Sequence, residues 1–223
     1  LMRTPGDDEE LAIGFLWTEG IITGGDDVLK VDLTTKENHA LVFLDDGVEV
    51  DLTRLTRHLF SASSCGLCGK ASIDAITSLH DPVPDGPSFP ESVLLEAPSF
   101  LRSAQETFEK TGGLHASGIF SREGKLLALR EDVGRHNALD KLLGWALLNA
   151  QDLSENFVLM SGRLSFELMQ KALAGRLPLV AGISAPSSMA VEFSRESNQT
   201  LVGFLRAPRY NVYAGAERLV SGC

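Results

Sequence analysis

The residues best suited to covalent chemistry are Cys65 and Cys68, which lie two residues apart in the run Ser63-Ser64-Cys65-Gly66-Leu67-Cys68-Gly69-Lys70. A thiol reacts as its thiolate, and a nearby cation, a helix N-terminus or a paired cysteine lowers the thiol pKa. Lys70 supplies a cation, and residues 71–79 have the composition of a helix whose positive end would face the sulfur atoms. The flanking glycines leave room for a large electrophile. We therefore expect the chemistry of this chain to take place at these thiols.

Cysteine spacing alone leaves four interpretations open. A structural zinc site needs four ligands, and the only other cysteine is Cys223. A disulfide between Cys65 and Cys68 would close a very short loop and stabilise little. A dithiol redox site of thioredoxin type expects a βαβ context, which is weak here. In the fourth interpretation, a thiolate accepts a sulfane sulfur as a persulfide, by attack on an S–S bond, and hands it on.

Composition and charge set limits on the class of protein. A hydrophobic content of 43% is ordinary for a globular domain, and no apolar run approaches the roughly 18 residues that span a membrane. The net charge of −10 argues against a general nucleic-acid binder. The acid is concentrated in residues 1–110, with 20 Asp and Glu against 8 Lys and Arg, whereas residues 111–223 carry 10 against 12. Three cysteines and no visible export signal predict a reducing compartment, the cytoplasm.

The first part of the chain predicts a small α+β domain over residues 1–80, ending in the cysteine segment. Residues 7–22 have an acidic first turn and helical spacing of apolar side chains, with Asp7 or Asp8 near the cap. We expect strands at 28–33, 40–44 and 48–52, the last two joined by the turn Asp45-Asp46-Gly47, in an antiparallel sheet backed by the helix. Residues 81–98 hold five of the nine prolines and predict a linker.

Residues 99–223 predict a second, larger domain. A helix at 99–111 ends at a Gly-Gly pair. Beyond it the pattern alternates, with strands expected at 115–121, 126–133, 157–160, 179–183, 201–205 and 210–213, and helices at 137–148, 166–174 and 188–197. This alternation indicates a layered α/β domain with helices on both faces of a mixed sheet. We therefore expect an α+β chain overall.

The loops at the expected strand ends carry small residues, hydroxyls and arginines. In open α/β sheets ligands bind outside the carboxyl ends of the strands, where helix N-termini present free N–H groups. The arginine side chain presents a fork of donors that suits phosphate. Four loops, at 132–137, 161–163, 184–188 and 206–209, place Arg135, Arg163, Arg206 and Arg209 there and predict a rim for a phosphate-bearing ligand. Ser and Asn are also ordinary helix caps, and His115 and His136 could each be structural, a general base or a metal ligand.

Five motifs occur together in this chain. They are the cysteine run, Gly112-Gly113-Leu114-His115, the stretch REDVGRHNALDK at 130–141, Ser161-Gly162-Arg163 and Ser184-Ala185-Pro186-Ser187-Ser188. Together they resemble the FdhD/NarQ family of formate dehydrogenase accessory sulfurtransferases, from about Met2 to the C-terminus. Members of that family begin further upstream, so the resemblance implies that N-terminal residues are missing from this sequence.

The resemblance implies a second domain similar to cytidine deaminases and a role as a sulfur carrier. Such a protein takes sulfur from a cysteine desulfurase and passes it to the molybdenum, or tungsten, bis(molybdopterin guanine dinucleotide) cofactor before insertion into apo formate dehydrogenase. The zinc signature of the deaminases has no counterpart here, because His115 is followed by Ala116 and Ser117, so we expect no bound metal. A homodimer is also implied.

The resemblance also assigns residues. Cys65 would carry the persulfide, and Cys68 would assist or resolve it. The cofactor-contacting segment of the family matches Phe204, Leu205, Arg206, Ala207, Pro208 and Arg209, to which we add His136 and Arg163 from the rim loops. Two other functions remain open: a cofactor-binding chaperone without sulfur chemistry, and a dithiol oxidoreductase that needs both cysteines equally.

Overall fold

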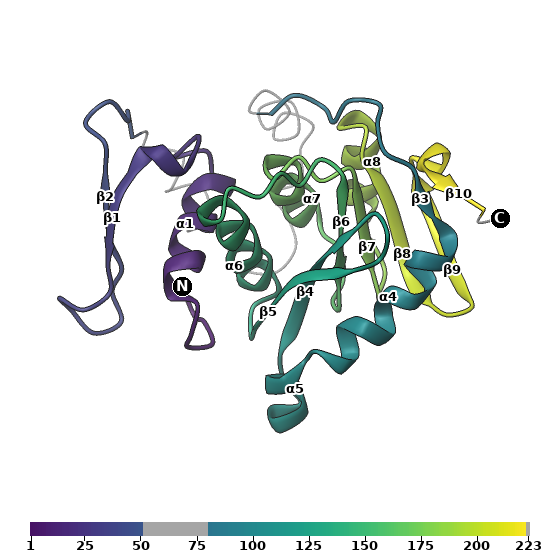
Figure 1. Ribbon diagram of the computed structural model, residues 1–223, viewed down its shortest axis with the longest axis horizontal. Coiled ribbons are helices and arrows are strands. Elements are labelled where there is room, and N and C mark those ends of the chain that lie inside the picture. The colour runs from purple at the N-terminus through teal and green to yellow at the C-terminus, as the bar shows by residue number, and fades with distance from the viewer. Residues whose placement is uncertain (51–79, 222–223) are drawn as a thin grey trace.

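The computed structural model describes residues 1–50 and 80–221, so the predictions that concern Cys65 and Cys68 lie outside the described residues. Within the described part, six strands form a mixed sheet in the order β5-β4-β6-β7-β8-β9 (Figure 1). Their bounds are β4 (His115–Ser121), β5 (Leu126–Asp132), β6 (Asn156–Met160), β7 (Leu179–Gly182), β8 (Thr200–Arg206) and β9 (Arg209–Ala214). Every strand expected in the second half of the chain is present within one or two residues, which confirms the fold class.

The strand directions place four carboxyl ends at one edge of the sheet. Strand β4 is antiparallel to both β5 and β6, while β6, β7 and β8 run parallel and β9 returns antiparallel to β8. Strands β5, β6, β7 and β8 therefore point the same way. We call their common end the carboxyl edge; it also holds His115, where β4 begins, and Arg209, where β9 begins.

Three helices, α6 (Arg135–Leu148), α7 (Phe166–Ala174) and α8 (Ser188–Glu196), cover one face of the sheet. Their buried residues form one core with the sheet, in which the rings of Phe166 and Phe193 meet edge to face with centroids 5.1 Å apart. All five residues of β6 are buried, as expected for a central strand that is covered on both faces. This is why residues 157–160 of β6 are all apolar.

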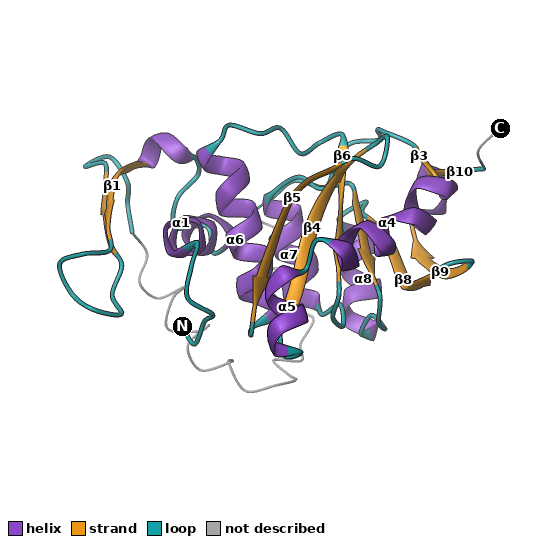
Figure 2. Ribbon diagram, turned by 60° about the horizontal axis from the view of Figure 1, so that its bottom comes forward, coloured by secondary structure: helices purple, strands orange, loops and turns teal. Residues whose placement is uncertain are grey.

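Helix α4 (Glu91–Ser103) covers the other face of the sheet, and α5 (Glu106–Thr111) follows it (Figure 2). The inner face of α4 presents Leu94, Ala97 and Leu101, at helical spacing, to a second core that includes the stacked rings of Phe120 and Phe157, 5.2 Å apart. The helix expected at 99–111 is therefore two helices.

The interpretation of residues 81–98 as a linker was wrong. Val83 and Phe89 are buried, and β3 (Phe89–Pro90) pairs in parallel with β10 (Leu219–Val220). Helix α4 begins directly after Pro90 and contains Pro98 in its interior, so the prolines interrupt the segment less than their number suggests. The division of the chain into two domains stays a prediction.

Helix α1 (Asp8–Thr18) is shorter than expected and ends before Ile21 and Ile22, which are buried against it. After the short 3-10 helix η1 (Gly25–Asp27), β1 (Val28–Asp32) and β2 (Leu41–Leu44) form an antiparallel hairpin. Of the strand predicted at 48–52, residues 48–50 form no strand and residues 51–52 lie outside the described residues. Since β2 pairs with β1 instead, the hairpin predicted across Asp45-Asp46-Gly47 was wrong within the described residues. The partner of β2 is β1, because Val28, Val31 and Leu44 share the apolar cluster beneath α1.

Helices α1 and α6 cross with their backbones in contact. A Cβ atom added to Gly14 would lie 1.8 Å from the carbonyl oxygen of Asp140, and one added to Gly144 would lie 1.9 Å from that of Glu10. Only glycine permits this approach at both positions. The crossing joins the first segment of the chain to the helical layer.

A buried polar cluster lies beside this crossing. The ammonium of Lys171 on α7 donates to Thr18 Oγ1 and Glu19 Oε1, both at 2.8 Å, and lies 3.0 Å from Asp140 Oδ1. Burial alone would lower the pKa of Lys171, but the carboxylates of Asp140 and Glu19 outweigh it and raise that pKa. The cluster ties α1, α6 and α7 together.

None of the described helices is long and apolar enough to cross a membrane.

Candidate functional site

The predicted rim loops meet at the carboxyl edge. The backbone N–H of Leu164 donates to Ala185 O at 3.1 Å, and that of Phe204 donates to Ser184 O at 3.1 Å. These bonds join the loops that follow β6, β7 and the bulged end of β8. The Ser161 hydroxyl accepts from the N–H of Ala116 at 2.9 Å, which links the loop after β6 to the start of β4. One edge therefore gathers the chemistry-bearing loops.

A pocket of about 780 Å³ opens at this edge, on the face of the sheet that α4 covers. Volumes of this size hold drug-sized ligands. Its walls come from α4, from α5 and the segment after it, and from the ends of the strands. They consist of Leu95, Pro98, Ser99, Leu101, Arg102, Gln105, Phe108, Gly112, Gly113, Leu114, His115, Ser161, Ile183, Leu205, Arg206 and Ala207. The pocket has an apolar body with two arginines and one histidine among its polar groups.

The wall formed by α5 is held by Glu131 of strand β5. Its carboxylate accepts from the backbone N–H groups of Thr107 at 2.9 Å and of Phe108 at 2.8 Å, both in the first turn of α5. On the other side of Phe108, the guanidinium of Arg102 lies 4.6 Å from the centre of the ring. These contacts tie α5 to the edge strand and to α4, and so fix the width of the pocket.

His115 is half-buried at the inner end of the pocket. A Cβ atom on Gly162 would lie 3.2 Å from His115 Nδ1, so the imidazole rests against the backbone of the loop after β6. Burial lowers the pKa of His115, and the positive charges of Arg135 and Arg163 lower it further. The imidazole is therefore neutral at neutral pH and can both donate and accept a hydrogen bond.

The turn between β8 and β9 has an unusual backbone. Phe204 has a φ of 52°, a region that bulky side chains rarely adopt, and its ring is 45% exposed. The ladder between β8 and β9 is irregular from Gly203 to Arg206, while Arg206 and Arg209 pair across the turn and are both exposed. This strained bulge points the side chain of Phe204 outward and buries that of Leu205.

His136 lies on the opposite side of the sheet from the pocket. It belongs to the first turn of α6, and its Nε2 is 3.3 Å from the hydroxyl of Ser165, which precedes α7. Burial lowers the pKa of His136 to about 4, with help from the charges of Arg135 and Lys171. It is therefore neutral at physiological pH, like His115.

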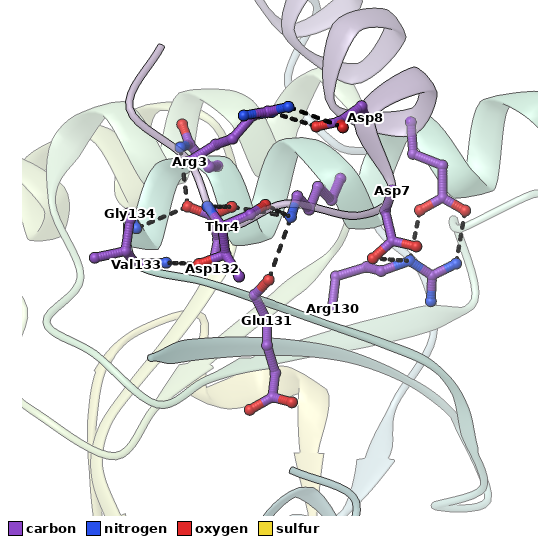
Figure 3. A network of polar contacts seen from close by, with 12 residues as sticks. Arg3, Thr4, Asp7, Asp8, Arg130, Glu131, Asp132, Val133 and Gly134 are labelled. Atoms are coloured by element: carbon purple, nitrogen blue, oxygen red, sulfur yellow. Dashed lines mark hydrogen bonds and ion pairs between the residues drawn. The ribbon is translucent and has the colours of Figure 1, made fainter. Parts of the chain in front are cut away.

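The loop after β5 is fixed by a buried ion pair and by the N-terminal segment (Figure 3). The carboxylate of Asp132, fully buried, contacts Lys141 Nζ at 2.9 Å and accepts from the backbone N–H groups of Thr4 and Gly134, each at 2.9 Å. The hydroxyl of Thr4 accepts in turn from the N–H of Val133 at 3.0 Å. Residues before α1 therefore hold the loop that leads into Arg135 and His136.

The structure places the predicted binding residues in three groups. Leu205, Arg206 and Ala207 line the pocket. Phe204, Pro208 and Arg209 belong to the same turn but lie outside the lining. His136 and Arg163 are not among the lining residues; Arg163 is exposed beside His115.

Sequence reasoning placed Ser161 in a rim loop but did not assign His115 or the α4–α5 wall to a binding site. The motif Gly112-Gly113-Leu114-His115 was the available signal for the first, whereas the prolines concealed α4. In the described part of the chain, no group of three or more His, Cys, Asp or Glu side chains could hold a metal ion.

Comparison with known proteins identifies relatives over nearly the whole chain. Three relatives named sulfur carrier protein FdhD are 48% identical in Streptomyces coelicolor, 44% in Mycobacterium tuberculosis and 39% in Saccharolobus solfataricus. Each alignment covers 98% of this chain, and 82%, 84% and 82% of the respective relative. A crystal structure from Desulfotalea psychrophila, described as a candidate formate dehydrogenase accessory protein, has the same fold, with a TM-score of 0.77 at 24% identity over 98% of this chain and 82% of that one. The model of the FdhD/NarQ family matches residues 1–220. The chain therefore belongs to the FdhD/NarQ family.

Proposed function

We propose that this protein is a sulfur carrier in which Cys65 holds a persulfide and delivers its outer sulfur to a molybdenum cofactor destined for formate dehydrogenase. The observation that carries the proposal is the pocket at the carboxyl edge, in a chain that also has a glycine-flanked cysteine pair. The names of the relatives support the sulfur-carrying role. Reduced thiols are needed, so we place the protein in the cytoplasm.

The loading step needs no external oxidant. The thiolate of Cys65 attacks the outer sulfur of a persulfide on the donor; the S–S bond of the donor breaks, the donor leaves as a thiolate, and Cys65 becomes a persulfide. A cysteine desulfurase, which forms such a persulfide from free cysteine, is the donor that we propose. Cys68 would resolve the persulfide when no acceptor is present: its thiolate attacks the inner sulfur, that of Cys65, the S–S bond of the persulfide breaks, hydrosulfide leaves, and a Cys65–Cys68 disulfide forms.

The acceptor substrate that we propose is bis(molybdopterin guanine dinucleotide), in its molybdenum or tungsten form. Each end of this molecule has an aromatic heterocycle next to phosphates. The pocket offers apolar walls for the ring and the guanidinium groups of Arg102 and Arg206 for the phosphates, which Arg binds as a two-pronged donor. Neutral His115 and the hydroxyl of Ser161 supply polar partners at the inner end. The residues present therefore fit a nucleotide end of this acceptor.

The acceptor has two nucleotide ends, and two copies of this chain would offer each end a pocket. We therefore propose a homodimer as the working form and apo formate dehydrogenase as the recipient of the loaded cofactor. A symmetric pair of chains is also the commonest assembly of soluble proteins.

The experiment follows sulfur on the protein. Incubated with a cysteine desulfurase and free cysteine, the protein should gain the mass of one sulfur atom on the peptide that contains Cys65, and Cys65→Ala should abolish both that gain and the activation of formate dehydrogenase. Full activation by a variant that lacks both cysteines would replace the proposal with a chaperone. An equal requirement for Cys65 and Cys68, with a reversible disulfide and no persulfide, would replace it with a dithiol oxidoreductase.

A further inference from the structure

The β1–β2 hairpin extends from the body of the molecule, and none of the other described residues covers one of its two faces. Figure 1 shows it at the far end of the structure from β9, with α1 between it and α6. The face that includes Val31 packs on the apolar cluster beneath α1. On the opposite face, Phe43 is 50% exposed and pairs with Lys30, and Leu41 is 39% exposed and pairs with Asp32.

The exposed face is more apolar than a solvated hairpin requires. Leu29, at the bulge of β1, is 66% exposed and is a third exposed apolar side chain of the hairpin, besides Leu41 and Phe43. A two-stranded hairpin is marginally stable in water, and exposed aromatic and leucine side chains that lie together mark interaction surfaces. The ammonium of Lys30 lies 5.9 Å from the centre of the Phe43 ring. This surface therefore fits a partner rather than bulk water.

Acidic residues lie at both ends of the hairpin. Residues 24–50 contain two lysines and seven acidic residues: Asp26, Asp27, Asp32, Glu37, Asp45, Asp46 and Glu49. Hydrogen bonds from the N–H groups and hydroxyls of Thr34 and Thr35 hold the pKa of Asp32 well below its usual range, so it stays charged at neutral pH. The complement of this surface is an apolar groove with a basic rim.

We propose that the β1–β2 hairpin is the docking surface for the protein that donates sulfur, and that this donor presents an apolar groove with a basic rim. The inference rests on the proposed function. In the sequence Cys65 follows the last residue of β2 by 21 positions, so the surface that we assign to the donor and the thiol that it loads belong to the same stretch of the chain. The pocket that would receive the acceptor lies on another part of the molecule, between α4 and the carboxyl edge, and stays open.

The charge of the hairpin disfavours the other occupants. Two copies related by a two-fold axis would bring two acidic hairpins together, and like charges in an interface repel. Nucleic acid and anionic membranes are repelled for the same reason.

The test compares a protein donor with a small one. The rate at which Cys65 gains sulfur is measured with a limiting amount of purified cysteine desulfurase and free cysteine, and separately with inorganic polysulfide, which needs no docking. The variants are Phe43→Ser, which removes the exposed ring, and Asp46→Asn with Glu49→Gln, which reduces the acidic charge. Phe100→Ser is the matched control, because Phe100 is 49% exposed but lies on α4.

We expect Phe43→Ser to slow loading by the desulfurase at least about tenfold, as for a buried aromatic anchor, and to leave loading by polysulfide unchanged. The charge variant should be slower at low salt and less sensitive to added salt than the parent. Phe100→Ser should behave as the parent with both donors, and all variants should melt at the temperature of the parent.

Three results would overturn the inference. If Phe43→Ser and the parent are loaded by the desulfurase at equal rates, the docking surface lies elsewhere, while the proposed function stands. If Phe43→Ser is loaded normally but fails to activate formate dehydrogenase, the hairpin serves the acceptor enzyme instead. If neither donor loads the parent protein, the proposed function itself has failed, and the inference with it.

Discussion

Replacing Gly14 with alanine tests whether α1 and α6 meet backbone to backbone. The new Cβ atom would lie 1.8 Å from the carbonyl oxygen of Asp140, and the two backbones would have to separate by about 1.6 Å to reach an ordinary contact of 3.4 Å. A gap of even 0.5–1 Å forfeits roughly a quarter to a half of each van der Waals contact along an interface. The displacement would also draw Thr18 away from Asp140, to which its hydroxyl donates at 2.8 Å.

The expected loss is the difference between two opposing effects. Alanine is a better helix former than glycine by about 1 kcal/mol. Overpacking in a tight core costs about 1–3 kcal/mol and occasionally more, and this clash is with backbone, which cannot rotate away. Taking the upper end of that range, about 3 kcal/mol, less the gain of about 1 kcal/mol, we expect Gly14→Ala to lower the free energy of unfolding by about 2 kcal/mol, against the roughly 5–15 kcal/mol that stabilises a typical domain.

Urea unfolding followed by circular dichroism measures this difference at constant pH and salt. Gly24→Ala is the control, because Gly24 has an extended φ of −163° and no atom within 4 Å of the position of a Cβ. The control should be as stable as the parent or slightly more stable. A Gly14→Ala protein as stable as the parent would show that the close helix crossing does not exist.

Three further predictions follow from the buried and pocket residues. Because the pKa of His136 is lowered to about 4 from an ordinary 6.5, the unfolded chain binds a proton as the pH falls below 6.5 while the folded protein does not. Between pH 6.5 and 4 the free energy of unfolding of the parent should fall by up to about 3 kcal/mol more than that of His136→Gln. Urea titrations at each pH measure both, and parallel pH profiles of the two proteins would contradict the prediction. Lys171→Met removes the ammonium that pairs with the buried carboxylate of Asp140 and should cost about 3–5 kcal/mol in thermal or urea unfolding, partly recovered by adding Asp140→Asn; a loss under 1 kcal/mol would argue against the cluster. Arg206→Ser should weaken the affinity for GDP, measured by calorimetry, by roughly tenfold without changing stability. Arg122→Ser, outside the pocket lining, should leave the affinity unchanged. Equal affinities of Arg206→Ser and the parent would show that the phosphates do not bind in this pocket.

The α/β part of the fold could be predicted from the sequence because its strands are covered on both faces. Strands such as β6 are wholly buried and consist mainly of apolar residues, and helices α7 and α8 carry apolar stripes. The Pro-rich segment was harder, because Pro98 lies inside α4 and composition outweighed the spacing of Leu94, Ala97 and Leu101. The hairpin was misassigned because a good local turn at Asp45-Asp46-Gly47 does not decide which strand β2 pairs with; the shared cluster beneath α1 does.

Only part of the candidate site could be predicted from the sequence, for a related reason. The loops at strand ends could be found, since the carboxyl edge follows from strand order and direction. The side of the sheet on which a residue lies is a tertiary property, so nothing local separated His136, beside Ser165, from His115, in the pocket. The wall built from α5 depends on Glu131 reaching across from β5, a contact between residues more than 20 positions apart.

The shared direction of β5, β6, β7 and β8 also bears on how such a protein can diverge. Framework and recognition are encoded in different stretches of sequence: the framework in buried strands and helix faces, recognition in the short connections that leave those strands. Where a connection makes no buried contact, substitutions in it cost little stability, so the recognition surface can change on an unchanged scaffold.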